Sequence, residues 1–337
     1  MIIEDRIKAF EKLGDFLMDF CNENPNSNHP LETIIKSSFS YNGWFTSSNI
    51  RFSISAICIN LSYTKLSSWL SSYSIPVEAK KNVSIIMAGN IPLVGFNDFL
   101  CVLMSGHRAI IKLSSKDNRL FLPIIEELIK IEPRFKDDIK LVEKVENFDA
   151  VIATGSNESH KHFEYYFKNY PTLLRKNRTS VAILTGEESL DERKALADDI
   201  FLYYGLGCRN VTKLYVPKNY DLNLLFEVFF EYQDVILNNK YANNYDYYRA
   251  IYMMGNHNIL ENGFIILKED KALHSPVAVL NYEYYDEKES LVLQLDELKE
   301  DIQCIVGKDF IPFGKAQQPN LKDYADGVDT LRFLEAI

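Results

Sequence analysis

The stretch NVSIIMAGNIPLVGF, residues 82–96, decides the fold. It is a short apolar run that ends in a Gly-Asn-x-Pro turn and leads directly into a helical pattern, which is typical of a strand followed by a helix. The stretches that follow repeat this change of pattern: FNDFLCVLMSG, RAIIKLSS, RLFLPIIEELIKI, KLVEKV, DAVIATGS and NESHKHFEYYFKNY. Strands that alternate with helices of this length predict a mostly parallel sheet. We therefore expect a doubly wound α/β layer over residues 81–180.

The rest of the chain divides around this layer. Residues 3–21 and about 49–73 have helical patterns, and NENPNSNHP breaks the first of them. A second α/β pass begins at TSVAILTG, and its later parts are a helix over 189–204, the strand VTKLYVP, a helix over 221–233, and the strands NGFIILKED, SPVAVLNY and CIVGKDFIPFG. We predict two doubly wound α/β domains with an N-terminal helical segment. Their bounds are 1–180 and 181–312, and a tail over 313–337 packs on the first domain or on a neighbouring subunit.

Composition limits the classes of partner and the compartment. The formal net charge of −10 argues against nucleic acid and anionic membranes, both of which require a basic face. No stretch has the roughly 18 consecutive apolar residues that a membrane span needs, and the charged N-terminus does not resemble a signal peptide. The five cysteines are scattered without metal-finger spacing, which predicts reduced thiols in the cytoplasm and no metal site.

Three turns are candidates for chemistry: AGNIP at 88–92, ATGSNES at 153–159, and the turn that holds Cys208 in GLGCRNVTKLYVP. We expect all three at the carboxyl ends of parallel strands, where open α/β sheets bind ligands. Each also has an ordinary structural interpretation. A Gly-Ser turn often only caps a helix, an Asn before x-Pro often only forms a turn, and a single cysteine is most often a small buried side chain.

Taken together and in this order, these motifs resemble the aldehyde dehydrogenase superfamily. Within it, they resemble the acyl-CoA reductase family that supplies fatty aldehyde to bacterial luciferase. The motifs on which this resemblance rests are the Asn-x-Pro turn, a lysine at the end of the next strand (Lys112), Gly155-Ser156 before a helix, and Cys208 in a turn before a strand. The stretches NGWFTSSNI, LLRKNRTSVAIL and DYADGVDTLRFL resemble the acyl-CoA reductase branch in particular.

The resemblance implies a reaction and roles for the two catalytic candidates. Cys208 would attack the thioester of an acyl-CoA and hold the acyl group as a covalent intermediate, and the aldehyde would be released after reduction by NADPH. Asn90 and the backbone N–H of Cys208 would stabilise the oxyanion. The substrate implied is a fatty acyl-CoA. An acyl phosphate, a short-chain thioester, or a non-catalytic subunit that binds an acyl-transferring partner are the alternatives.

The resemblance also implies a cofactor site. Lys112 would hold the adenosine ribose, and Gly155 and Ser156 would lie against the nicotinamide or the pyrophosphate. Many NAD-preferring relatives carry a Glu three positions after this lysine. Ser115 stands there in this chain, which favours the 2′-phosphate of NADP(H). A solvated charge cluster at a helix start is the alternative interpretation of this region.

Departures from the superfamily pattern are informative as well. SVAILTG lacks the carboxylate that activates water in the hydrolytic members, which fits transfer to and from coenzyme A. Ala272 stands where a Glu anchors the nicotinamide ribose. His274 is a candidate acid/base or coenzyme A contact, or else a packed or capping histidine. Arg178 is a candidate phosphate contact, or else part of a solvated charge run. Superfamily members are usually dimers or tetramers, so a homo-oligomer is expected.

Overall fold

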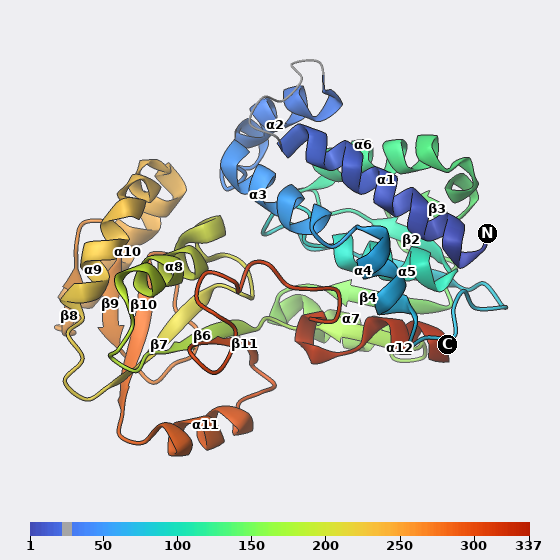
Figure 1. Cartoon of the computed structure of the whole chain (residues 1–337). Helices are drawn as coiled ribbons and strands as arrows, with labels where there is room; N and C mark the ends of the chain where they lie inside the picture. The colour runs from blue at the N-terminus through green and yellow to red at the C-terminus, as the bar shows by residue number, and fades with distance from the viewer. Residues whose placement is uncertain (22–28) are drawn as a thin grey trace. The chain divides into compact units, whose positions relative to one another are not determined.

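The computed structural model describes residues 1–21 and 29–337, so the break predicted at NENPNSNHP lies almost entirely outside the described residues. The chain divides into two compact units (Figure 1). The first unit contains residues 1–177 and 320–337, and the second contains residues 178–319. Each unit is built on its own sheet.

The sheet of the first unit is parallel throughout, with the strand order β3-β2-β1-β4-β5. Its strands are β1 (Asn82–Ile86), β2 (Arg108–Lys112), β3 (Ile139–Leu141), β4 (Ala150–Thr154) and β5 (Thr172–Arg175). The chain proceeds from β1 to β2 and β3 on one side, and then returns to place β4 and β5 on the other side of β1. The β1/β4 boundary is therefore a topological switch point, where open α/β sheets bind ligands at the carboxyl ends of their strands.

Helices pack around this sheet, and their apolar side chains form one core with it. The helices are α1 (Ile3–Cys21), α2 (Pro30–Tyr41), α3 (Ser47–Cys58), α4 (Tyr63–Leu70), α5 (Phe96–Ser105), α6 (Asn118–Ile131), the 3₁₀ turn η1 (Pro133–Asp137), α7 (Asn157–Phe167), the 3₁₀ turn η4 (Ala325–Gly327) and α12 (Thr330–Ala336). Phe10 of α1 makes edge contacts with Phe99 of α5 and with Phe135, and all three rings are buried. The predicted helical region 49–73 is two helices, α3 and α4, separated at residues 59–62.

The C-terminal segment completes the first unit. Helix α12 packs on α5, with Leu331 and Leu334 fully buried. Arg175 at the end of β5 is itself buried, and its guanidinium donates to Asp98 of α5 at 2.5 Å and to the Thr330 hydroxyl at 3.0 Å. This ion pair joins β5, α5 and the start of α12. Arg175 belongs to the core, whereas the sequence placed it in a charge run.

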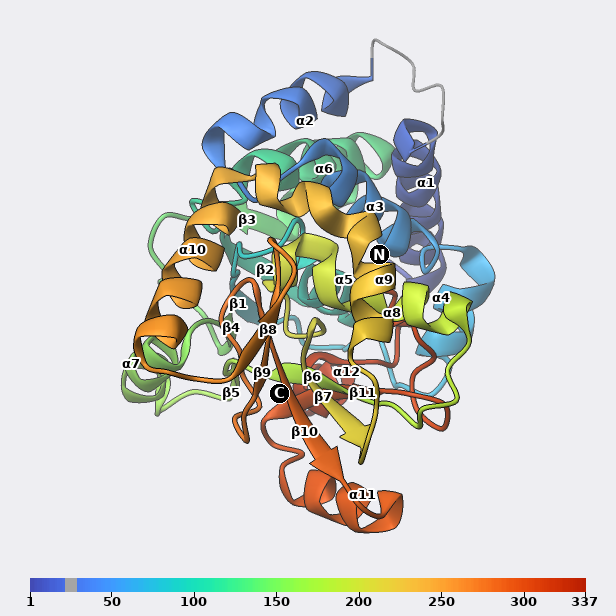
Figure 2. The ribbon, with the colours of Figure 1, turned by 90° about the vertical axis from the view of Figure 1, so that its left-hand side faces the viewer.

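The sheet of the second unit has the order β11-β6-β7-β10-β9-β8. Its strands are β6 (Thr179–Ile183), β7 (Val211–Pro217), β8 (Ile259–Glu261), β9 (Ile266–Glu269), β10 (Val279–Tyr285) and β11 (Ile302–Val306). Strand β8 is antiparallel to β9, and the other pairings are parallel. Figure 2 shows β6, β7 and β10 next to one another in this sheet.

The second unit has helices on both faces of its sheet. They are α8 (Leu190–Phe201), the 3₁₀ turn η2 (Leu202–Gly205), α9 (Asn223–Phe229), the 3₁₀ segment η3 (Phe230–Leu237), α10 (Asn239–Met254) and α11 (Lys288–Glu297). Alternate residues of the strands face two separate clusters. Ala182 and Leu214 pack with α8 and α9, whereas Val181 and Tyr215 pack with α11. The predicted helix 189–204 ends at residue 201, because the next residues turn into left-handed backbone.

The predicted fold class is confirmed: both units are α/β layers built on mostly parallel sheets, and a helical segment precedes the first strand. Among the described residues, no helix combines the length and the apolar character that crossing a membrane requires.

Candidate active site

Asn90 lies in the turn directly after β1, at the carboxyl edge of the first sheet and beside the switch point. It is exposed, while Gly89 before it is buried. A Cβ on Gly89 would lie 2.5 Å from the Ser114 hydroxyl oxygen, so this position requires glycine. The turn after β1 and the loop after β2 therefore touch, which is why the Asn-x-Pro turn needs its preceding glycine.

Lys112 ends β2 in register with Ile86 of β1, so its chain position is at the same edge as the Asn90 turn. Lys112, Ser115 and Lys116 are exposed, and the nearby Arg119 stacks on Tyr41 with 3.1 Å between its guanidinium carbon and the ring centroid. These basic side chains, with a serine at position 115, suit a phosphate group better than a bare ribose. The donor set thus fits an anionic, phosphate-bearing cofactor.

Gly155 and Ser156 follow β4 on the other side of the switch point. The Ser156 hydroxyl accepts the Ser159 backbone N–H at 3.2 Å and caps α7. A Cβ on Gly155 would lie 2.8 Å from the Ser159 Cβ, so the helix packs directly on the turn. Ser156 therefore caps α7, as the alternative interpretation of this motif expects. Its contact with a cofactor stays a prediction.

Asp117 supports this edge of the sheet and was not among the residues expected from the sequence. Its side chain is buried, and one oxygen accepts the Leu93 backbone N–H at 2.7 Å, three residues after Asn90. Its other oxygen, Oδ1, has no hydrogen-bond partner among the described residues. Burial raises the pKa of Asp117 to about 8, against the opposing effect of the Leu93 hydrogen bond. At neutral pH this carboxyl is mostly protonated, so it adds little negative charge beside Lys112.

Cys208 lies in the second unit, and one expectation about it is wrong. Its turn precedes β7, so it lies at the amino end of that parallel strand and not at the carboxyl end. It also belongs to a different sheet from Asn90 and Gly155. The sequence showed a turn beside a strand, but the order of helix, turn and strand places this turn at the start of the strand that follows it.

Several hydrogen bonds hold the turn around Cys208. The Ser180 hydroxyl donates to the Cys208 carbonyl at 3.0 Å, and Arg209 donates to the Ala316 carbonyl at 3.3 Å. The Asn210 side chain accepts the Gly207 N–H at 2.8 Å. The Cys208 side chain is only half-buried within this fixed backbone. Asn210 and Ser180 are further positions that the sequence did not single out, since Asn and Ser near turns are common.

The other cysteines are less suited to react. Burial raises the pKa of the half-buried Cys21 to about 11 and that of the buried Cys58 to about 12. The pKa of Cys101 is raised well above its usual value by burial, and Cys304 is buried against the Ser180 hydroxyl. Because a nucleophilic cysteine must reach solvent and ionise, Cys208 is the best candidate among them.

His274 and Arg178 have different surroundings. The His274 side chain is exposed, and partial desolvation by its neighbours lowers its pKa, while Asp301 acts in the opposite direction. The Arg178 guanidinium donates to the carbonyls of Lys299 and Ile302, at 3.0 and 3.4 Å. Arg178 therefore anchors the entry into β11, and a phosphate would compete with those carbonyls. His274 stays a candidate.

The carboxylate of Glu188 is engaged in the turn before α8. It accepts the backbone N–H groups of Thr185 and Gly186, at 2.5 and 3.1 Å, and the Thr185 hydroxyl at 2.8 Å. Glu188 thus holds the turn after β6. Its carboxylate is therefore occupied within this turn, just before the Ser189 cap of α8.

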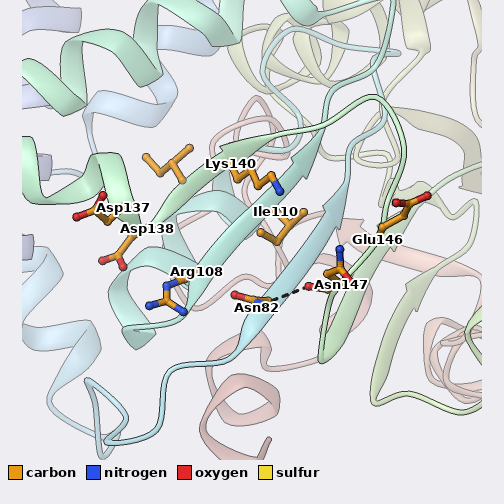
Figure 3. Close-up of a pocket in the computed structure, with 9 residues that line it drawn as sticks. Asn82, Arg108, Ile110, Asp137, Asp138, Lys140, Glu146 and Asn147 are labelled. Carbon is orange, nitrogen blue, oxygen red and sulfur yellow. Dashed lines mark hydrogen bonds between the residues drawn. The ribbon is translucent and has the colours of Figure 1, made fainter.

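Each unit has a pocket among its described residues. One, of about 240 Å³, lies at the amino ends of β1, β2 and β3, with Asn82, Arg108 and Lys140 on its walls (Figure 3). It is at the opposite edge of the sheet from Asn90 and Lys112. The other is a narrow, mostly apolar pocket in the second unit whose lining includes Gly205 and Val211, on either side of Cys208 in the sequence. Cys208 itself lines neither of these two pockets.

Comparisons with known proteins show a family match and a shared fold. Residues 71–229 match the model of the family described as acyl-CoA reductase (LuxC). Among solved structures, an NAD-dependent aldehyde dehydrogenase from Sinorhizobium meliloti is similar at a TM-score of 0.67 and 12% identity, covering 91% of this chain and 70% of that one. An indole-3-acetaldehyde dehydrogenase in complex with NAD⁺ is similar at a TM-score of 0.65 and 14% identity, covering 91% and 72%. No curated protein matches the sequence.

The resemblance to acyl-CoA reductases is confirmed over residues 71–229, and the aldehyde dehydrogenase fold is confirmed by the structural similarity. The matched residues include the Asn90 turn, Lys112, Gly155-Ser156 and Cys208. The family match, together with the aldehyde dehydrogenase fold, supports an oxidoreductase that acts on acyl groups or aldehydes.

Proposed function

We propose that this protein reduces an acyl-CoA to the aldehyde with NADPH and releases coenzyme A, through an acyl group held covalently on Cys208. The observation that carries the proposal is that one family match spans every motif the reaction needs, from the Asn90 turn to the Cys208 turn. Cys208 is half-buried on a fixed turn, whereas Cys58, Cys101 and Cys304 are buried and burial raises the pKa of the half-buried Cys21 to about 11; this supports the role of nucleophile for Cys208.

The chain's own residues would carry out the acyl transfer. The Cys208 thiolate forms a bond to the thioester carbon, and the carbon–sulfur bond to coenzyme A breaks, with the electron pair leaving on the coenzyme A thiolate, which takes up a proton. Asn90 and the Cys208 backbone N–H would donate to the oxyanion that forms on the carbonyl oxygen. One such donor contributes roughly 2.7–4 kcal/mol to the transition state. Asn90 lies in the first unit and Cys208 in the second.

Lys112, Ser115 and the Gly155-Ser156 turn would hold the cofactor at the switch point of the first sheet. NADPH, when bound, supplies the hydride that reduces the acyl carbon. Loss of the Cys208 thiolate from the reduced carbon then releases the aldehyde and restores the enzyme. The balanced reaction consumes acyl-CoA, NADPH and one proton, and it yields aldehyde, coenzyme A and NADP⁺. The absence of a carboxylate in SVAILTG supports acyl transfer over hydrolysis.

The match to the acyl-CoA reductase family supports an acyl-CoA as the substrate, and we propose a fatty acyl group as its acyl part. A series of acyl-CoAs from acetyl to palmitoyl would identify the preferred chain length.

Single-turnover oxidation of NADPH with acyl-CoA tests the proposal. Wild-type protein should consume one NADPH per site and form aldehyde, and Cys208→Ala should consume none. Cys21→Ala is the matched control, since it removes a half-buried thiol from the first unit, and it should react as the wild type does. Equal rates in the wild type and Cys208→Ala, or no consumption by the wild type, would refute the proposal.

A further inference from the structure

The segment that leads from α8 to Cys208 has an unusual backbone. Tyr203, Tyr204 and Gly205 follow one another in the left-handed region, with φ of 54°, 58° and 76°. A left-handed conformation costs a residue with a Cβ about 1–2 kcal/mol, so two successive tyrosines in it require a compensating interaction. The interaction must lie nearby, because the strain is confined to these residues.

Asn210 provides that interaction at the helix end. Its side chain is fully buried, and its amide nitrogen faces three backbone carbonyls, those of Asp199, Ile200 and Leu202, at 3.2, 3.3 and 2.7 Å. The first two belong to the last turn of α8, whose carbonyls have no partner within the helix. The Asn210 side chain thus donates to the carbonyls at the end of α8 and holds the chain where it leaves the helix.

The same residue closes the turn that contains Cys208. The Asn210 amide oxygen accepts the Gly207 N–H at 2.8 Å, and the Asn210 backbone N–H donates to the Gly207 carbonyl at 3.0 Å. Its backbone carbonyl accepts the Ser180 N–H of β6 at 3.2 Å. The amide can adopt only this orientation, because a flipped side chain would place its oxygen against three carbonyls.

We infer that Asn210 is the positioning residue of Cys208: as the last residue of the 207–210 turn, it ties Gly207 at the start of the turn to the end of α8 and so fixes the Cys208 thiol and backbone N–H. The inference rests on the proposed function for the role of that thiol, but not for the geometry. Ser180 and Arg209 also hold this turn, through the Cys208 and Ala316 carbonyls. Among these three residues, Asn210 is the one whose side chain bonds both to Gly207 at the start of the turn and to the end of α8.

Substitution of Asn210 should therefore change the reactivity of Cys208 in a folded protein. In Asn210→Ala, the turn loses its link to α8. The pH profile of Cys208 alkylation by iodoacetamide should then depart from that of the wild type, because the thiol no longer stands on a fixed turn. The rate is read from the Cys208 peptide by mass spectrometry. With acyl-CoA, kcat should fall about 100-fold, since a displacement of about 1 Å has that effect, while KM changes little.

Asn210→Asp gives an internal test within one variant. A protonated Asp can donate to the Leu202 carbonyl and accept from Gly207 N–H, whereas an ionised Asp places a charged oxygen against three carbonyls. Cys208 in this variant should therefore resemble the wild type at low pH and resemble Asn210→Ala at high pH. This comparison also remains informative if Asn210→Ala does not fold.

Asn238→Ala is the matched control. Asn238 is a buried asparagine of the same unit that caps α10 through Lys240 N–H at 3.0 Å, so it is expected to lower stability without moving the Cys208 turn. Its alkylation profile should match that of the wild type. The inference is overturned if the profiles of Asn210→Ala and Asn210→Asp both superimpose on the wild type. If the profiles shift as expected but wild-type Cys208 is never acylated by acyl-CoA, the proposed function fails and the positioning role stands.

Discussion

The buried carboxyl of Asp117 makes the stability of the first unit depend on pH in a defined direction. Burial raises its folded-state pKa from the ordinary 3.8 to about 8. Below about pH 4 the carboxyl is protonated in both the folded and the unfolded chain. As the pH rises above 4, the unfolded chain ionises while the folded chain does not, so unfolding becomes more favourable up to about pH 8. The stabilising contribution of the protonated group is thus lost across this range.

The magnitude follows from one proton per molecule. Between pH 5 and 7 the free energy of unfolding of the wild type should fall by about 1.4 kcal/mol per pH unit relative to Asp117→Asn, which cannot ionise. Over these two units, the difference between the two proteins should grow by about 2.7 kcal/mol. The asparagine retains an oxygen that can accept the Leu93 N–H, so the turn that follows Asn90 should keep its shape.

Urea unfolding followed by tryptophan fluorescence measures this difference. Both tryptophans, Trp44 and Trp69, lie in the first unit, so the signal reports the unit that contains Asp117. Asp137→Asn, which removes an exposed carboxyl from the same unit, controls for the loss of one negative charge. Stability curves of the wild type and Asp117→Asn that run parallel from pH 5 to 7 would refute the reasoning.

Three further results are expected. Asn90→Ala should lower kcat with acyl-CoA by roughly 10²–10³-fold, as for the loss of one oxyanion donor, and an unchanged kcat would remove Asn90 from that role. Ser115→Glu should lower kcat/KM for NADPH by about tenfold or more and leave kcat/KM for NADH unchanged, because a like charge about 4 Å from the 2′-phosphate costs on the order of 1–4 kcal/mol. Initial rates with each cofactor measure this difference. Arg175→Ala should destabilise the first unit by about 3–5 kcal/mol in urea unfolding, since it leaves Asp98 buried without its partner, and a loss below about 1 kcal/mol would contradict that expectation.

The sequence alone determined the fold class and the residues around the first sheet. Apolar runs separated by turns and helical patterns identify parallel strands because each strand buried on both faces must be apolar throughout. The Asn90 turn, Lys112 and Gly155-Ser156 each follow or end such a strand. Their common edge therefore follows from chain order, because the carboxyl ends of parallel strands share one edge.

The tertiary structure decided the surroundings of Cys208 and the roles of the buried polar groups. The sequence analysis expected Cys208 at the carboxyl edge of a sheet, whereas its turn precedes β7 and therefore lies at the amino end of that strand. Asn210, Asp117 and Arg175 look like ordinary turn or surface residues in the sequence. Their partners are the end of α8, the turn after β1 and helix α5, and only folding brings these together. A buried polar side chain must find a hydrogen-bond partner wherever the fold provides one, and no local pattern records which segment that is.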